Sequence, residues 1–187
     1  GTSNLECTGQ FVVNSNGDEP DLDLSNAGCD TDAEMDGDQC TLRAAIEQAN
    51  LCPGKDVVTF AMAEGMLKPA SRLPAIKDAL VLNGTDQPPF GEVTLSGSKA
   101  GDAEGLLIYT GNVRVSSFNI TGFSRDGIRA KNGPEDIIYL DSVDLNANCG
   151  WGVRSAGIVR VNMDTVTANP GQLSEINENG IGEGCSG

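Results

Sequence analysis

The sequence predicts an all-β protein of the β-solenoid class, in which parallel strands stack coil upon coil after a single α-helix. Two observations carry this prediction. A repeat of 23 to 25 residues, made of short strands without helix, runs through the second half of the chain. One amphipathic helix pattern stands just before the first expected coil. Repeats of this length and content are typical of solenoids.

The repeat is visible at five apolar positions. In the first unit these positions hold Val113, Val115, Phe118, Ile120 and Ile128. They recur 25 residues later as Ile138, Leu140, Val143, Leu145 and Val153, and a further 23 residues on as Val161, Met163, Val166, Ala168 and Ile176. Their alternation predicts inward side chains, so that Phe118, Val143 and Val166 share one column. A jelly roll or sandwich also has short strands and turns, but the self-match favours the solenoid.

The same alignment places polar residues at one turn of the coils. Asn146 and Asn169 fall at the position of Thr121. Polar side chains that recur at one position of a parallel stack can form a hydrogen-bonded ladder. We therefore expect such a ladder along one corner of the solenoid.

The helix pattern runs from Thr41 to about Asn50. Thr41 can cap its first turn, and Pro53-Gly54 stops it. Its apolar face consists of Leu42, Ala45, Ile46 and Ala49. Because a solenoid ends in an exposed apolar cross-section, we expect this face to cover the first coil. The polar residues expected to contact water are Arg43, Glu47 and Gln48.

The domain organisation follows from these elements. Residues 1–60 are expected to form an N-terminal cap of strand, acidic loop, helix and strand. Residues 61–187 are expected to form the coils of the parallel β-helix and a Gly-rich C-terminal tail. With 187 residues, the two parts are expected to form one continuous domain.

The charge composition restricts the partners. The chain has 12 Lys and Arg against 27 Asp and Glu, a net charge of −15, so nucleic acid and anionic membrane surfaces would repel it. It has no histidine, which removes Ser-His and Cys-His nucleophile pairs and His-ligated metal sites. No apolar run approaches the roughly 18 residues of a transmembrane helix, so we expect no membrane insertion.

The six cysteines predict disulfides and an oxidising compartment. They are an even number, widely spaced and without a CxxC pair. Six cysteines allow about 15 pairings, and free buried thiols remain an alternative. The preferred pairing joins the ends of the acidic loop, the N-terminal strand to the helix end, and the C-terminal tail to the coils: Cys29–Cys40, Cys7–Cys52 and Cys149–Cys185. We expect a secreted or cell-surface protein.

An acidic run between Asp18 and Asp38 holds nine acidic residues and no basic one. It has too little apolar content to pack, and is expected to be a solvated loop unless a cation orders it. The alternating carboxylates and the glycine of a Ca²⁺ loop appear in Asp30, Asp32, Glu34, Asp36, Gly37 and Asp38. Counted from Asp32, the pattern fails at its twelfth position, which is Arg43 and not Glu. The segment is therefore expected to be either a calcium site, with calcium as the protein's one cofactor, or a plain solvated loop.

The segments "FVVNSNGDEPD", "CDTD" and "GDQCTLRAAIEQANLCPGKDVVTF" resemble the N-terminal segment of the CSLREA family. These are secreted or surface-exposed bacterial proteins, in which a Cys-Ser-Leu-Arg-Glu-Ala-Ile-like helix precedes a right-handed parallel β-helix. The match covers residues 11–60. Thr41 replaces the motif Ser, and Ala44 replaces the Glu, which removes the capping-box carboxylate. The resemblance implies the fold and export, and it supplies no catalytic residues.

Three function classes remain. Parallel β-helices include polysaccharide lyases and hydrolases, which need clustered charges on one face. Asp141 aligns with Asp164 and Arg129 with Arg154, but both pairs are also ordinary surface charges, and aromatic residues are only 4% of the chain. Ice binding would need rows of threonine, which Thr165 and Thr167 do not form. We favour a non-catalytic extracellular structural or adhesive protein, which stacks end to end with itself or binds other surface proteins; the alternative is polysaccharide binding or cleavage.

Overall fold

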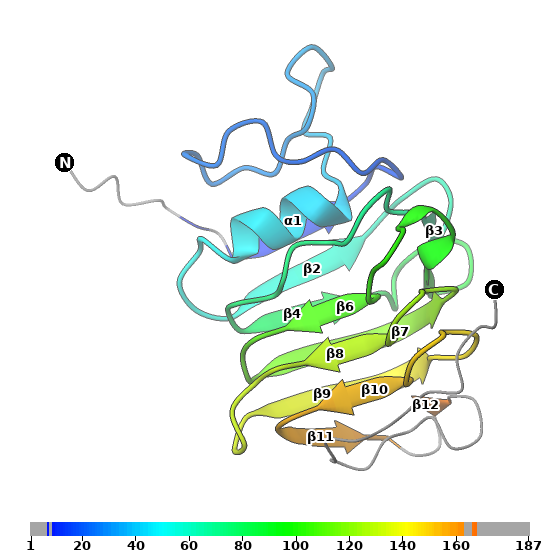
Figure 1. Ribbon diagram of the computed structural model, residues 1–187. Helices are drawn as coiled ribbons and strands as arrows, with labels where there is room; N and C mark the ends of the chain where they lie inside the picture. The colour runs from blue at the N-terminus through cyan, green and yellow to red at the C-terminus, as the bar shows by residue number, and fades with distance from the viewer. Residues whose placement is uncertain (1–6, 8, 163–165, 168–187) are drawn as a thin grey trace.

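The chain folds into a parallel β-solenoid of about four turns, closed at its N-terminal end by a single α-helix (Figure 1). The computed structural model describes residues 7, 9–162 and 166–167. Every strand pair among these residues is parallel, which confirms the predicted solenoid and excludes the antiparallel jelly roll.

The elements are short, as the sequence indicates. The helix α1 spans Leu42–Ala49, and a 3-10 turn spans Gly97–Lys99. The strands are β1 (Gln10–Val13), β2 (Asp56–Phe60), β3 (Met66–Leu67), β4 (Leu80–Asn83), β5 (Val93–Ser96), β6 (Leu106–Ile108), β7 (Val113–Thr121), β8 (Ile128–Ala130), β9 (Ile137–Asp144), β10 (Val153–Ser155), β11 (Ile158–Val161) and β12 (Val166–Thr167).

The strands form three walls around the core. The first wall holds β1, β2, β4, the first halves of β7 and β9, and β11. The second holds β3, β5, the second halves of β7 and β9, and β12. The third is the separate sheet of β6, β8 and β10. The first two walls meet where Ser117 and Ser142 adopt left-handed φ values of 57° and 54°, which bend β7 and β9 sharply.

Inward side chains form continuous columns through the coils. Phe11, Val58, Leu82, Val115 and Leu140 lie in register on successive strands, and all are buried. The predicted column of Phe118, Val143 and Val166 is confirmed in the backbone register. Each coil therefore covers the apolar surface of the one before it.

The repeat predicted one register correctly and another incorrectly. Between β7 and β9 the offset is 25 residues, as predicted. Between β9 and β11, Ile138 and Leu140 pair with Val159 and Val161, not with Val161 and Met163. Val143 pairs with Val166, so the corner between β11 and β12 contains two extra residues, which a constant period cannot reveal. Met163, Ala168 and Ile176 lie outside the described residues.

The helix α1 covers the N-terminal end of the core, as predicted. Its four apolar residues, Leu42, Ala45, Ile46 and Ala49, are buried in the common core. The Ala44 N–H donates to Thr41 Oγ1 at 3.1 Å, so Thr41 is the N-cap. At the other end, Asn50 Nδ2 donates to Ala75 O at 2.8 Å and the Lys77 N–H donates to Asn50 Oδ1 at 2.7 Å. These bonds fix the helix to the first coil.

The outer face of α1 is covered as well, so the expectation that Gln48 contacts water is wrong. Gln48 is 0% exposed, and its Nε2 donates to Gly28 O at 2.7 Å and Asn26 O at 3.1 Å. Glu47 accepts the Asp21 N–H at 3.0 Å, and Arg43 pairs with Asp18 at 2.9 Å. The acidic segment thus forms a second layer over the helix (Figure 1).

This acidic segment is ordered, although its side chains are mostly exposed. Its carboxylates accept backbone N–H groups two residues ahead: Asp23 N–H donates to Asp21 Oδ1 at 2.8 Å, and Glu34 N–H donates to Asp32 Oδ1 at 3.0 Å. The Thr31 N–H also donates to Gln39 O at 2.9 Å. Such turns satisfy the backbone locally, so the segment is ordered without an apolar core of its own.

Buried amide side chains join neighbouring coils. Asn148 Oδ1 accepts the Phe123 N–H at 3.1 Å, and its Nδ2 donates to Ile120 O at 2.8 Å. The predicted ladder at Thr121 is wrong for Asn146, whose side chain hydrogen-bonds to Asp144 in its own coil. Asn169 lies outside the described residues.

Two disulfides join cysteines as predicted. Cys7–Cys52 and Cys29–Cys40 have Cα–Cα distances of 5.6 Å and 5.1 Å, within the usual range. The third predicted pair, Cys149–Cys185, includes Cys185, which is outside the described residues. Two disulfides indicate an oxidising compartment. No helix in the described part of the chain has the length and hydrophobicity needed to cross a membrane.

Candidate functional site

The proposed calcium ligands all lie in the loop closed by the Cys29–Cys40 disulfide. They are Asp30, Asp32, Glu34, Asp36 and Asp38. Asp30 Oδ1 accepts the N–H groups of Gln39 at 3.0 Å and Asp32 at 3.1 Å, and these bonds lower the pKa of Asp30. Within the described ranges, no three Asp, Glu, Cys or His side chains form a group that could hold a metal ion. Calcium binding here stays a prediction.

The two aligned arginines lie together on the third wall. Arg129 and Arg154 are paired in register on β8 and β10, and both approach one carboxylate. Asp126 Oδ2 lies 3.6 Å from Arg129 Nη1 and 3.4 Å from Arg154 Nε, while its Oδ1 accepts the Trp151 N–H at 2.8 Å. Asp126 is buried, so the arginines compensate a carboxylate removed from water.

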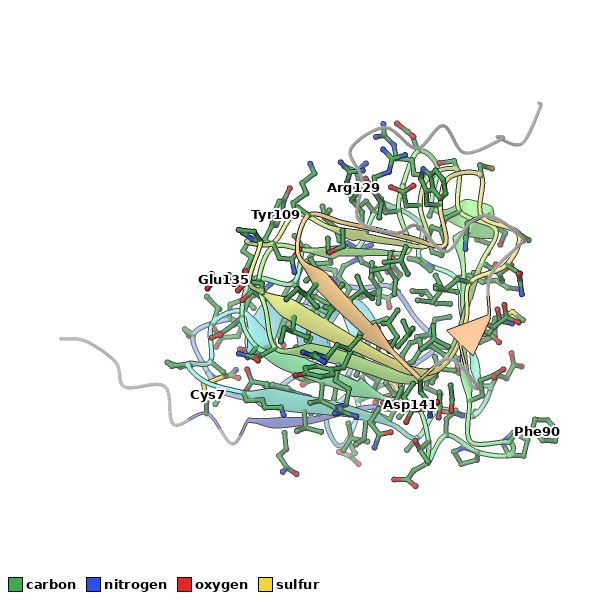
Figure 2. All side chains as sticks on the ribbon, turned by 90° about the horizontal axis from the view of Figure 1, so that it is seen from below. Cys7, Phe90, Tyr109, Arg129, Glu135 and Asp141 are labelled. Carbon is green, nitrogen blue, oxygen red and sulfur yellow. A yellow bond between two sulfur atoms is a disulfide. The ribbon has the colours of Figure 1, made fainter. Side chains whose placement is uncertain are left out.

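Asp141, the described member of the aligned acidic pair, does not join this arginine cluster. Asp141 lies on β9, and Figure 2 shows it on the opposite side of the solenoid from Arg129. Asp141 Oδ1 accepts a hydrogen bond from Asn162 Nδ2 at 3.3 Å. Asp164 lies outside the described residues. Asp141 and the two arginines therefore belong to different walls.

A buried carboxylate was missed by the sequence reasoning. Asp56 begins β2, points inward with Val58 and Phe60, and is 2% exposed. Its Oδ2 has no hydrogen-bond partner. Burial, and then the negative charge of Asp78, raise the pKa of Asp56 to about 6. The period-two rule could have found it, because Asp56 shares the parity of the two apolar residues.

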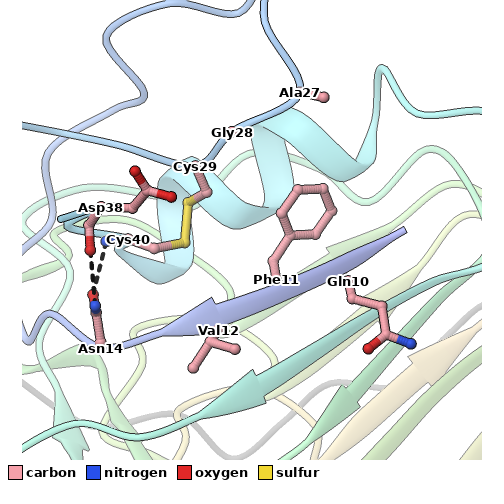
Figure 3. A pocket seen from close by; sticks show the side chains of 9 residues that line it. All are labelled: Gln10, Phe11, Val12, Asn14, Ala27, Gly28, Cys29, Asp38 and Cys40. Atoms are coloured by element: carbon pink, nitrogen blue, oxygen red, sulfur yellow. Dashed lines mark hydrogen bonds between the residues drawn. A yellow bond between two sulfur atoms is a disulfide. The ribbon is translucent and has the colours of Figure 1, made fainter. Parts of the chain in front are cut away.

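A groove of about 560 Å³ lies between β1 and the acidic layer (Figure 3). Its walls consist of Gln10, Phe11, Val12 and Asn14 on one side, and Ala27, Gly28, Cys29, Asp38 and Cys40 on the other. Asn14 closes one end, because its Nδ2 donates to Asp38 O and its Oδ1 accepts the Cys40 N–H, both at 2.8 Å. No motif in the sequence indicated this groove, which exists only because the acidic layer folds back over β1.

An exposed apolar loop projects from the corner between β4 and β5. Its tip is Pro88-Pro89-Phe90, and Phe90 is 90% exposed and stands away from the walls (Figure 2). The base is fixed, because the buried Gln87 hydrogen-bonds to the Met62 backbone and the Gly91 N–H donates to Gln87 O at 2.7 Å. A fixed loop loses little conformational entropy when it binds a partner.

Comparison of the chain with protein-family models, curated proteins and solved structures finds no match in any of the three.

Proposed function

We propose that this protein is a non-catalytic extracellular or cell-surface structural and adhesive β-helix protein, which associates with copies of itself or with other surface proteins. The observation that carries the proposal is the Phe90 loop. A large aromatic side chain, almost fully exposed on a fixed loop, is the kind of residue that supplies binding energy at protein interfaces.

The charged groups support a non-catalytic role. Asp126 is engaged by two arginines and a backbone N–H, and Arg125 pairs with Asp102, so these groups compensate one another's charge. Asp56 is buried at the start of β2, away from solvent. The two disulfides and the resemblance to the CSLREA family support export, and the net charge of −15 disfavours nucleic acid and anionic membranes as partners.

The helix α1 and the acidic layer above it restrict how copies of the chain could associate. The helix and the acidic layer together cover the N-terminal end, so end-to-end stacking there would have to displace both layers. The Phe90 loop instead projects from the side of the solenoid, at the corner between β4 and β5 (Figure 2). We therefore place the self-association contact at this loop and the side walls.

Sedimentation velocity at rising protein concentration tests the proposal, with negative-stain images of the same samples. We expect the wild-type chain to associate and the Phe90→Ser variant to remain monomeric. Leu51→Ser is the matched control, because Leu51 is also exposed but lies at the end of α1; it should associate like the wild type. A wild-type chain that stays monomeric throughout would contradict self-association.

Polysaccharide binding or cleavage is the second candidate. On the third wall, the Lys131 ammonium lies 5.7 Å from the centre of the exposed Tyr109 ring, and Arg129 lies on the same side (Figure 2). Aromatic faces and cations together suit acidic sugars. A panel of acidic polysaccharides, assayed for binding and for new reducing ends or unsaturated products, tests this candidate. Tyr109→Ala should abolish binding. If no assay detects a reaction product, cleavage is contradicted and only polysaccharide binding is supported.

A further inference from the structure

We propose that the groove between β1 and the Cys29–Cys40 loop binds an extended basic peptide segment of a partner protein, which adds to β1 as a further strand. This inference deepens the adhesive role proposed above by naming the chemistry of a partner. The ligand contacts would come from the backbone of β1 and from Asp38 in the groove wall, with the other carboxylates of the Cys29–Cys40 loop nearby in the sequence.

At Val12, the edge of β1 away from β2 carries backbone groups that no described residue pairs. The carbonyls of Gly9 and Val13 accept the Val57 and Ala61 N–H groups of the neighbouring segment, each at 2.8 Å. Because backbone groups alternate along a strand, the N–H and C=O of Val12 point to the opposite edge. No described residue hydrogen-bonds to them there. Unpaired backbone groups at a strand edge can accept another extended chain, and here Val12 supplies one N–H and one C=O.

The shape of the groove is the second argument. Gly28 and the Cys29–Cys40 disulfide face β1 across the groove, so the acidic layer overhangs the strand edge. A space of about 560 Å³ beneath this overhang suits a narrow extended segment better than the broad end of another solenoid. The Val12 side chain, 51% exposed, lies at the edge where a bound strand would place a neighbouring side chain. The groove therefore fits a peptide and not a second β-helix end.

The Cys29–Cys40 loop beside the groove carries only negative charge. The loop between Cys29 and Cys40 holds five carboxylates, Asp30, Asp32, Glu34, Asp36 and Asp38, and no Lys or Arg. Asp38 lines the groove itself. The nearby Arg43 is already paired with Asp18 at 2.9 Å. A peptide with Lys or Arg side chains would find complementary charge, and one with Asp or Glu would be repelled.

The experiment uses a hexapeptide of alternating lysine and valine, blocked at both ends and carrying a fluorophore, and a matched peptide of alternating glutamate and valine. The fluorescence anisotropy of each peptide is measured as the full chain is added. The lysine peptide should bind saturably, with an affinity that falls as the salt concentration rises, and the glutamate peptide should not bind. Val12→Pro removes the free N–H without touching the β1–β2 hydrogen bonds, and should weaken binding by about tenfold or more. Val12→Thr keeps the N–H and is the matched control.

A second variant protects the test if Val12→Pro fails to fold. Asp36→Asn combined with Asp38→Asn preserves side-chain shape, and should weaken the lysine peptide and reduce the salt dependence. Equal binding of both peptides, unchanged affinity in Val12→Pro, or no saturable binding at low salt would each overturn the inference. None of these outcomes changes the sedimentation result for Phe90→Ser, so a failed groove is distinguishable from a failed self-association proposal.

Discussion

Gln87 holds the backbone of Met62, 25 residues earlier, by two hydrogen bonds across adjacent coils. The Met62 N–H donates to Gln87 Oε1 and Gln87 Nε2 donates to Met62 O, both at 3.0 Å. Both residues are buried, so water cannot replace these bonds. The same amide fixes the base of the Phe90 loop, which links the packing of the second coil to the surface that we propose for association.

Replacing Gln87 tests this link. Gln87→Ala should lower the free energy of unfolding by roughly 3 kcal/mol, because it leaves a buried N–H and a buried C=O without partners. Urea unfolding followed by circular dichroism measures the change. Gln39→Ala is the matched control, because its amide makes an exposed bond to Gly37 O at 3.3 Å, and it should change stability by less than about 0.5 kcal/mol. Equal losses of stability in the two variants would show that the Gln87–Met62 hydrogen bonds contribute no more than an exposed hydrogen bond.

The two disulfides should differ in their effect on stability. Cys7–Cys52 spans 45 residues and Cys29–Cys40 spans 11. In the chain-entropy account, the disulfide that closes the longer loop stabilises the folded state by about 1 kcal/mol more than the other. We therefore expect Cys7→Ser with Cys52→Ser to lower the free energy of unfolding more than Cys29→Ser with Cys40→Ser. The reverse order in urea unfolding would show that the short disulfide acts mainly in the folded state, by holding the acidic layer on Gln48.

The buried Asp56 predicts an unusual pH dependence. Its folded-state pKa of about 6 lies above the ordinary value of 3.8, so the folded state holds the proton more tightly than the unfolded state. Its contribution to stability therefore falls as pH rises from about 4 to about 6, and the penalty persists above that range.

Replacing the carboxylate isolates this effect. Asp56→Asn should raise the free energy of unfolding by roughly 2 kcal/mol at pH 7.5, and the gain should disappear near pH 4. Thermal unfolding of both proteins across this range measures it. Asp141→Asn, the same exchange on β9 in the first wall, serves as the control. A variant that is no more stable than the wild type at pH 7.5 would contradict the assignment.

Chelation tests whether calcium orders the acidic layer. The layer is held by the Cys29–Cys40 disulfide, by Gln48 and by carboxylates that accept backbone N–H groups. Because these bonds need no cation, we expect EDTA to leave the melting temperature within about 2 °C of its value in calcium. A larger fall on chelation would show that Asp30 and its neighbours rearrange into a structural calcium site.

The sequence alone was sufficient to predict the solenoid, the helix that covers its end and two disulfides. Alternation along a strand, helical spacing and a repeat are properties of the chain read in order, and Phe118 and Val143 fall in register for that reason. For the acidic layer, composition predicted a solvated loop. Composition cannot show that Gln48 hydrogen-bonds to the carbonyls of this layer, or that Asp30 accepts the N–H of Gln39.

Tertiary structure decided where the chemistry lies. It placed Asp141 and Arg129 on different walls, set Asp126 between two arginines, and buried Asp56 without a partner. It also formed the groove beside β1, which requires a segment more than ten residues away in sequence to fold back over the strand. The physical reason is that a repeat records which side chains face inward, whereas a site depends on which backbone and side-chain groups from distant segments meet.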